Sequence, residues 1–354
     1  MAGVFSLARA GHWFLHSGIQ SGAGGVARYY RADLQKNKPV STEITGYTAS
    51  ALVFLYSVTK DEEYLERARL TARFLCDHAW DAELGTFPFE YLSGEDHSYF
   101  FDCGIIIRGL MAVWRVTRED RLLDVASAAS NGMLADFHSG TDFHPILSLP
   151  GKQALPREAH WSRMAGCYQT KSALAWWELA EITGDGKLRA AYLELLGASL
   201  ATYRDFLPGT DERLRVMDRL HPACYFLEAL YPVLARTDCR EAYGYTVDAV
   251  GRYLREIAPD FCRSDVYAQL LRARVYGAAA LPVDMGAARE EAAALREFQV
   301  SSDDPRLDGG FLFGRRHGEM VPHSNPVSTA FALQALEVWR AFEGGEPLCP
   351  LPPL

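Results

Sequence analysis

Apolar residues recur with the period of an α-helix along almost the whole chain. The segment 61–78, DEEYLERARLTARFLCDH, is typical of the pattern: acidic residues open it, basic residues follow, and one side is apolar. That arrangement suits both the helix dipole and a helix that is buried on one face. The pattern predicts helices near 4–18, 42–59, 61–78, 100–117, 119–137, 166–183, 186–206, 221–235, 238–257, 265–278, 283–299 and 326–343.

The predicted helices alternate between two kinds. One kind is amphipathic and charged, as in 61–78, whereas the next is apolar on nearly every side, as in GIIIRGLMAVW and SALAWWELA. A helix that is apolar all round has to be buried all round. We therefore predict an all-α fold, the (α/α)6 toroid, in which outer helices surround a ring of about six inner helices. The buried helices recur every 40 to 65 residues or so, which is too irregular for a solenoid.

The connections between the helices also alternate. Links that lead out of a buried helix are short, such as TKDE and TRED, whereas links that lead into one are mostly long and rich in Gly, Pro and aromatic residues. The long loops therefore gather at one end of the ring, where functional groups tend to concentrate. No linker or low-complexity tract divides the chain, so we expect one toroid over 1–345 and a short proline-rich tail over 346–354.

Composition narrows the class of partner. The net charge of −9 over 354 residues argues against a nucleic-acid partner, which would need a basic face. No apolar stretch is long enough for membrane insertion, and the N-terminus does not resemble a signal peptide. The seven cysteines are odd in number and lack zinc-knuckle spacing, so we expect a cytoplasmic protein. We expect no cofactor and no metal, because His12 and His16 lack the Glu of a zincin motif.

Polar and ionisable groups open all six buried helices at the same end. Taken singly, Asp, Ser, Thr and Asn at such positions are ordinary N-caps. Tyr, Gln, Lys and His cap poorly, so the set as a whole indicates a functional site. The openings are Thr42 to Tyr47, Tyr99 to Asp102, Tyr168 to Lys171, His221 with Pro222, Ser264 to Tyr267, and His323 to Asn325.

The order of the helices predicts which of these groups meet. In a closed ring of six, the second inner helix faces the fifth, which places Asp102 opposite Asp265, the leading candidates for an acid/base pair. The first faces the fourth, which places Glu43 opposite His221, a candidate base with Pro222 at the predicted first helical position. We expect five catalytic residues to converge on one cavity: Glu43, Tyr47, Asp102, His221 and Asp265.

Such a cavity suits carbohydrate chemistry. Glycoside hydrolysis needs two carboxyl groups, whereas epimerisation or β-elimination beside a uronate needs a base and a group that stabilises the intermediate. Trp80 and Trp161 lie in or beside long loops and could stack on a sugar, and Arg306 and Arg315 could clamp an anionic one or simply form surface ion pairs. The predicted substrate-binding set is Trp80, Trp161, Arg306, Arg315, His323 and Asn325.

Several segments together resemble a known group of proteins. The order GAGGVARYY, TEITGY, FFDCGIIIRGLMAVW, QTKSALAWWELAEITGD, HPACYFLEAL and SNPVSTAFALQALEVW looks like bacterial proteins of the six-hairpin glycosidase type. It is most similar to a group associated with exopolysaccharide biosynthesis. The likeness spans nearly the whole chain, and it implies the toroid fold and an oligo- or polysaccharide substrate, with hydrolysis, elimination and epimerisation all open.

Two other functions remain open from the sequence. The glycine-aromatic loop from Gln299 resembles the repeat of terpene cyclases and protein prenyltransferases, which are also toroids. The cyclases need Asp-x-Asp-Asp, whereas this chain has Ser301-Ser302-Asp303-Asp304, so an isoprenoid substrate ranks second. The third possibility is a scaffold that holds a partner in the cleft without catalysis. Oligomeric state does not follow from the sequence.

Overall fold

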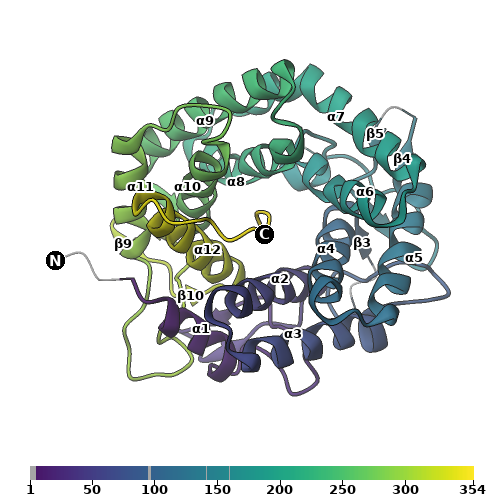
Figure 1. The fold of residues 1–354 in the computed structure, drawn as a ribbon, viewed down its shortest axis with the longest axis horizontal. Coiled ribbons are helices and arrows are strands. Elements are labelled where there is room, and N and C mark those ends of the chain that lie inside the picture. Colours follow the sequence, from purple (N-terminus) through teal and green to yellow (C-terminus); the bar gives the residue numbers. More distant parts are fainter. Residues whose placement is uncertain (1–4, 95–96, 141, 159) are drawn as a thin grey trace.

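The structure is a computed structural model that describes residues 5–94, 97–140, 142–158 and 160–354. The described residues form twelve α-helices joined by loops and short strands (Figure 1). The helices are α1 (Leu7–His16), α2 (Thr42–Thr59), α3 (Glu62–Phe74), α4 (Phe100–Thr117), α5 (Asp120–Phe137), α6 (Gln169–Thr183), α7 (Gly186–Phe206), α8 (Arg213–Leu230), α9 (Thr237–Ile257), α10 (Ser264–Gly277), α11 (Met285–Arg296) and α12 (Pro326–Glu343).

The predicted closed ring is confirmed. The inner helices α2, α4, α6, α8, α10 and α12 each pack against the next, and α12 packs against α2. The outer helices α3, α5, α7, α9 and α11 each cover the inner helix that precedes them, and α1 covers α12, so the chain forms an (α/α)6 toroid (Figure 1). The inner helices are buried on nearly all sides, as in α4, where every residue from Phe100 to Met111 is buried.

Glycines let the first three inner helices of the chain, α2, α4 and α6, approach one another closely. A Cβ atom on Gly109 of α4 would lie 2.5 Å from the carbonyl oxygen of Gly46 in α2, and one on Gly104 would lie 2.5 Å from the Cα of Ser172 in α6. No real side chain fits at such distances, so only glycine permits this packing. The beginning of α2 at Gly46 therefore lies against the middle of α4, at Ile105, Ile106 and Gly109.

The helix predicted near 221–235 was wrong at its start. The structure begins α8 at Arg213, so Pro222 lies inside the helix and His221 lies in its middle. A proline in a helix interior removes one backbone hydrogen bond, a local cost that packing can override. Here α8 is buried on nearly all sides from Leu220 to Leu230 between neighbouring inner helices, and this packing holds the helix together across the proline.

Short antiparallel strands tie the long loops together at the end where the inner helices begin. The ladders follow the orders β10-β1-β2, β3-β6, β4-β5 and β7-β8-β9. Their bounds are β1 (Tyr30–Arg31), β2 (Lys36–Asn37), β3 (His97–Tyr99), β4 (His138–Ser139), β5 (Asp142–Phe143), β6 (Ile146–Ser148), β7 (Phe261–Arg263), β8 (Gly314–Arg316), β9 (Glu319–Met320) and β10 (His323–Ser324). Short π and 3₁₀ turns are η1 (Leu75–Ala79), η2 (Trp161–Arg163) and η3 (Tyr231–Val233).

The C-terminal residues return to the middle of the ring. The carbonyl groups of Pro353 and Leu354 accept hydrogen bonds from side chains of the inner helices α4 and α6, and the chain ends near the ring centre in Figure 1. Across the described ranges, no helix has both the length and the apolar character needed to cross a bilayer.

Candidate active site

A cavity of about 450 Å³ opens among the long loops, above the starts of the inner helices. Its volume falls within the range of small-molecule sites. The cavity wall brings together four of the five residues that the sequence predicted as catalytic: Glu43, Asp102, His221 and Asp265. They come from α2, α4, α8 and α10, so the cavity collects side chains from separate inner helices.

Glu43 and Asp102 form a pair of carboxyl groups with little solvent. Asp102 is 6% exposed, and its Oδ2 atom has no hydrogen-bond partner among the described residues. Burial raises the pKa of Asp102 well above its usual range, and the nearby Glu43 raises it further, against an opposing effect of Arg28. Burial also raises the pKa of Glu43, to about 7, although Arg28 and Lys171 lower it. Burial therefore favours the protonated form of Asp102.

Helix capping does not account for the presence of Glu43 and Asp102 at the starts of their helices. The N-cap of α2 is Ser41, whose hydroxyl accepts a bond from the backbone N–H of Ile44 at 3.4 Å. In α4 the residue at the N-cap is Tyr99, with no side-chain capping bond, and Asp102 lies a turn further on. Neither carboxyl is needed to close its own helix, so both are available to the cavity.

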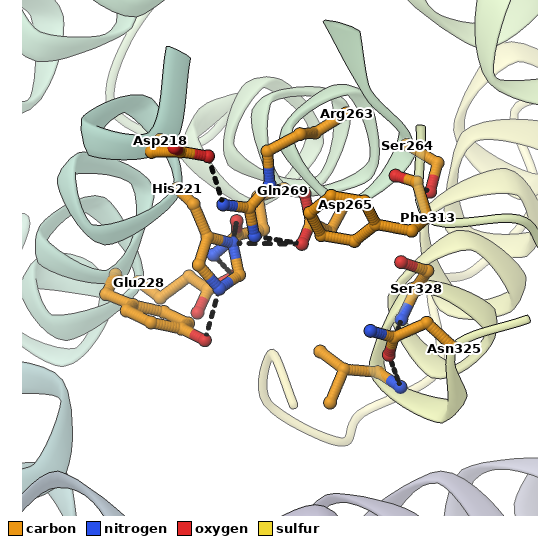
Figure 2. A network of polar contacts seen from close by, with 12 residues as sticks. Asp218, His221, Glu228, Arg263, Ser264, Asp265, Gln269, Phe313, Asn325 and Ser328 are labelled. Atoms are coloured by element: carbon orange, nitrogen blue, oxygen red, sulfur yellow. Dashed lines mark hydrogen bonds and ion pairs between the residues drawn. The ribbon is translucent and has the colours of Figure 1, made fainter. Parts of the chain in front are cut away.

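The environment of Asp265, unlike that of Asp102, favours the ionised carboxylate. Arg263, at the end of β7, grips its carboxylate with two hydrogen bonds, from Nε to Oδ1 at 3.0 Å and from Nη2 to Oδ2 at 2.6 Å (Figure 2). Burial by itself would raise the pKa of Asp265, but Arg263 and His221 hold it below its usual range. Asp265 is therefore ionised. Arg263 is itself fixed by Asp218 at 3.2 Å and by the ring of Phe313 at 4.6 Å.

His221 is held through both of its ring nitrogens. Nδ1 lies 2.6 Å from Oε1 of Gln269 (Figure 2). Nε2 lies 2.7 Å from the hydroxyl of Tyr225. The ionised carboxylate of Glu228 only accepts, so Gln269 turns its amide nitrogen toward it at 3.5 Å and presents Oε1 to His221. Nδ1 therefore carries the proton and donates, and Nε2 accepts from Tyr225. Burial lowers the pKa of His221 to about 4, which keeps the imidazole neutral.

Tyr47 lies beneath the cavity and does not line it. Its ring is buried, packs edge-on against Phe331 at 5.1 Å between ring centres, and has the ammonium of Lys171 5.0 Å from its centre. Burial raises the pKa of its hydroxyl well above the usual range. Tyr47 is thus part of the buried core and not of the cavity wall.

The predicted substrate-binding residues separate into two groups. Trp161, His323 and Asn325 line the cavity, although Asn325 uses its Oδ1 to cap α12 at the backbone N–H of Val327, 2.8 Å away. The structure does not bring the other three to this cavity. Trp80 packs on Phe87, and the two arginines form ion pairs at 2.8 Å, as the alternative interpretation of those charges proposed. The pairs are Arg306 with Asp304 and Arg315 with Glu297.

Comparison with known proteins identifies solved structures that have a similar fold. No protein-family model matches the sequence, and no curated protein matches it. Solved structures do. A cellobiose 2-epimerase from Spirochaeta thermophila has 11% identity and a TM-score of 0.70, with 93% of this chain and 94% of that one covered. A D-mannose isomerase has 10% identity and a TM-score of 0.70, with 95% and 96% covered. An unsaturated glucuronyl hydrolase from Bacillus sp. GL1 has 15% identity and a TM-score of 0.64, with 96% and 97% covered.

The fold is that of the six-hairpin toroids. The likeness extends over nearly the full length of each chain, so the helix order and ring closure of this toroid match those of the solved structures. The expectation of a six-hairpin glycosidase-like fold is confirmed.

Sequence reasoning missed several residues of the toroid's cavity. Arg28 lies in the first long loop, 5.0 Å from the ring centre of Phe89, within the segment GAGGVARYY, which the sequence reasoning did not connect with the cavity. Tyr225 and Arg263 had detectable signals: Tyr225 stands four residues after His221, which is one helical turn, and Arg263 stands two residues before Asp265. No group of three or more His, Cys, Asp and Glu side chains could hold a metal ion within the part of the chain that the structure describes.

Proposed function

We propose that the protein is a carbohydrate-active enzyme that cleaves a glycosidic bond by general acid/base catalysis, with Asp102 as the acid. The observation that carries the proposal is the contrast between two carboxyl groups in one cavity. Burial raises the pKa of Asp102, whose Oδ2 has no hydrogen-bond partner among the described residues, whereas Arg263 holds the pKa of Asp265 below its usual range. Environments that separate the pKa values of two carboxyl groups in this way assign one to the acid and one to the anion.

The proposed catalytic steps follow from the ionisation preferences of these two carboxyl groups. Asp102 gives its proton to the glycosidic oxygen as that bond breaks, and a water molecule attacks the sugar carbon from the other side. Asp265 stabilises the positive charge that develops on the sugar and takes the proton of the attacking water. Between turnovers Asp265 releases its proton to bulk water. Glu43, whose pKa is raised to about 7, takes a proton from bulk water and passes it to Asp102.

The remaining cavity wall fits a saccharide. Trp161 and Tyr29 supply aromatic faces on which sugar rings stack. Arg28 is half-exposed and its ion pair with Glu90 is long, at 3.4 Å, which leaves a cation for an anionic group such as a uronate carboxylate. The solved structures of similar fold are named for action on saccharides, which favours a saccharide over an isoprenoid.

Epimerisation or isomerisation is the second candidate, and one observation favours it. His221 and His323 both line the cavity, and burial lowers the pKa of each to about 4. Neutral imidazoles can take and return the proton of a sugar carbon. His221 is less suited to this role than His323, because both of its ring nitrogens already form hydrogen bonds within the protein.

Incubation with a panel of neutral and uronate-bearing oligosaccharides in D₂O distinguishes the reactions. Shorter products without deuterium on carbon support hydrolysis, an unsaturated product marks elimination, and deuterium on carbon without cleavage marks epimerisation. Turnover of an isoprenoid diphosphate, or no turnover of any compound, contradicts the proposal. The control pair is Asp102→Asn and Asp124→Asn, the latter at an exposed position on α5.

We further propose that the protein works in a reducing compartment, the cytoplasm, without a nucleic-acid partner. The seven cysteines are all free thiols, and six of them are buried. The net charge of −9 disfavours binding to the phosphates of a nucleic acid.

A further inference from the structure

The segment that follows α12 runs along the ring axis toward the cavity. Residues 350–354, which we call the axial segment, form neither helix nor strand. The chain reaches them from the finish of α12, at the end of the ring away from the cavity, and the yellow segment then leads to the ring centre in Figure 1. Leu351 is bound at Tyr276, the thirteenth residue of α10, whereas Leu354 is bound at Lys171, the third residue of α6.

Side chains from four inner helices bind the backbone of the axial segment. The main-chain oxygens of its last four residues accept hydrogen bonds from Tyr276 of α10 at 3.3 Å, Gln334 of α12 at 3.2 Å, Arg108 of α4 at 2.8 Å and Lys171 of α6 at 2.7 Å. The N–H of Leu354 donates to Oε1 of Gln334 at 3.1 Å. In the closed ring α4 and α6 lie across from α10 and α12, so the segment joins opposite sides of the ring.

Leu354 completes a closed circuit of buried hydrogen bonds. Lys171 binds Glu228, and Glu228 binds Arg272. Arg272 in turn donates to Oε1 of Gln334 at 2.7 Å. Leu354 closes the circuit, because it donates to Gln334 and accepts from Lys171. The four side chains are at most 4% exposed, so loss of the axial segment would leave buried donors on Lys171 and Gln334 without these acceptors.

This arrangement matches the recognition of an extended proline-rich peptide. Three of the five residues in the axial segment are prolines and have no N–H, so its site has chiefly to supply donors to carbonyl groups and apolar contacts to side chains. The ring supplies both, since Pro353 and Leu354 are buried and Leu354 belongs to the core. The link over residues 343–347, by contrast, is exposed and contains two glycines, so it can open without exposing the core.

We propose that the ring centre is a binding site for an extended proline-rich peptide, entered from the end away from the cavity, and that the axial segment occupies it as a tethered, exchangeable ligand. The site is separate from the cavity, and the inference does not rest on the proposed function. One chain of contacts joins the two sites. The ammonium of Lys171 lies 4.5 Å from the ring centre of Tyr225, whose hydroxyl lies 2.7 Å from Nε2 of His221 in the cavity wall.

Peptide exchange in the folded, full-length protein tests the inference without any saccharide. A recognition sequence for a specific protease is inserted between Glu346 and Pro347, in the exposed link, and the folded protein is cut there. The probe is the synthetic peptide PLPPL, the sequence of residues 350–354, with a fluorescent group at its start. The control peptide is ALAAL, which keeps the leucines and loses the prolines. Fluorescence anisotropy measures binding, and circular dichroism shows whether the cut protein stays folded.

We expect PLPPL to bind the cut protein saturably and ALAAL not to. The uncut protein should bind PLPPL at least about tenfold more weakly, because the tether gives its own segment a high effective concentration. Gln334→Leu removes a donor and an acceptor from the site and should weaken binding to the cut protein. Gln153→Leu, the same change at an exposed loop position, should leave binding unchanged.

A second measurement covers a cut protein that does not stay folded. Cys349 adjoins the axial segment and is the only one of the seven cysteines that is not buried. In the uncut protein an excess of PLPPL should displace the segment and speed the reaction of Cys349 with a thiol reagent, as followed by mass spectrometry, whereas ALAAL should not. The inference is overturned by a cut segment that neither leaves nor exchanges with PLPPL, by equal binding of the two peptides, or, where the cut protein unfolds, by a Cys349 rate that PLPPL leaves unchanged.

Discussion

Replacement of Glu43 by glutamine should make the protein more stable in alkaline solution, with no gain in acid. The carboxyl of Glu43 is desolvated beside a second carboxyl, Asp102, and its pKa is raised from 4.5 to about 7. A neutral amide of the same shape keeps the packing and removes the charge. The expected gain in stability therefore depends on pH in a way that loss of packing would not.

The sign and size follow from proton linkage. Below pH 4.5 the Glu43 carboxyl is protonated in the folded and unfolded chains alike, so its ionisation costs nothing. Between pH 4.5 and 7 the unfolded chain ionises first, and the free energy of unfolding falls as the pH rises. Above pH 7 the penalty is complete and constant. The rise in pKa corresponds to at most about 3 kcal/mol, because one pH unit is equivalent to about 1.4 kcal/mol.

Thermal unfolding of wild type and Glu43→Gln at pH 5 and pH 8 measures the effect. For a chain of this length a 3 kcal/mol gain raises the unfolding midpoint by about 4 °C at pH 8, with a much smaller difference at pH 5. Glu66→Gln, at an exposed position on α3, is the matched control and should change neither value. A difference for Glu43→Gln that is the same at both pH values would refute the reasoning.

Three further predictions concern single side chains. Asp102→Asn should lower kcat by about 10²- to 10⁴-fold with KM changed only a few-fold, because it removes the acid and keeps the shape; steady-state kinetics on the active saccharide measure both. His221 should lower the free energy of unfolding by about 2 kcal/mol between pH 8 and pH 5. In that range the histidine of the unfolded chain takes up a proton, whereas the buried one, with a pKa of about 4, does not. Urea unfolding of wild type and His221→Gln at both pH values measures this difference. Trp161→Ala should raise KM about threefold to tenfold through loss of stacking and leave kcat nearly unchanged, whereas a loss in kcat alone would contradict a binding role.

The ring could be predicted from the sequence because the inner helices are apolar on every side and the outer ones are not. A helix such as α4 has no stable place except inside a second shell, so its composition fixes its position. The start of α8 could not be predicted, because the local signal of Pro222 was overridden by burial against helices that are distant in the sequence. Local signals fail where tertiary packing supplies the larger free energy.

The cavity could be predicted in part for the same reason. Helix order alone brought Glu43, Asp102 and Asp265 to one end of the ring, and the structure places all three in the cavity wall. Their ionisation depends on partners that the sequence reasoning did not assign to them: Arg263 binds Asp265 from a short strand, and Lys171, on a third inner helix, lowers the pKa of Glu43. Charges placed by loops and by opposite sides of a ring are set by the fold as a whole.

The most direct test of the account is the structure of the Asp102→Asn variant with the saccharide that the wild type turns over. The account predicts a sugar ring within the cavity, with the glycosidic oxygen within hydrogen-bond distance of the side chain at position 102 and the sugar carbon facing Asp265. A saccharide bound outside the cavity, or one whose glycosidic oxygen lies beyond the reach of position 102, would contradict the assignment of Asp102 as the acid.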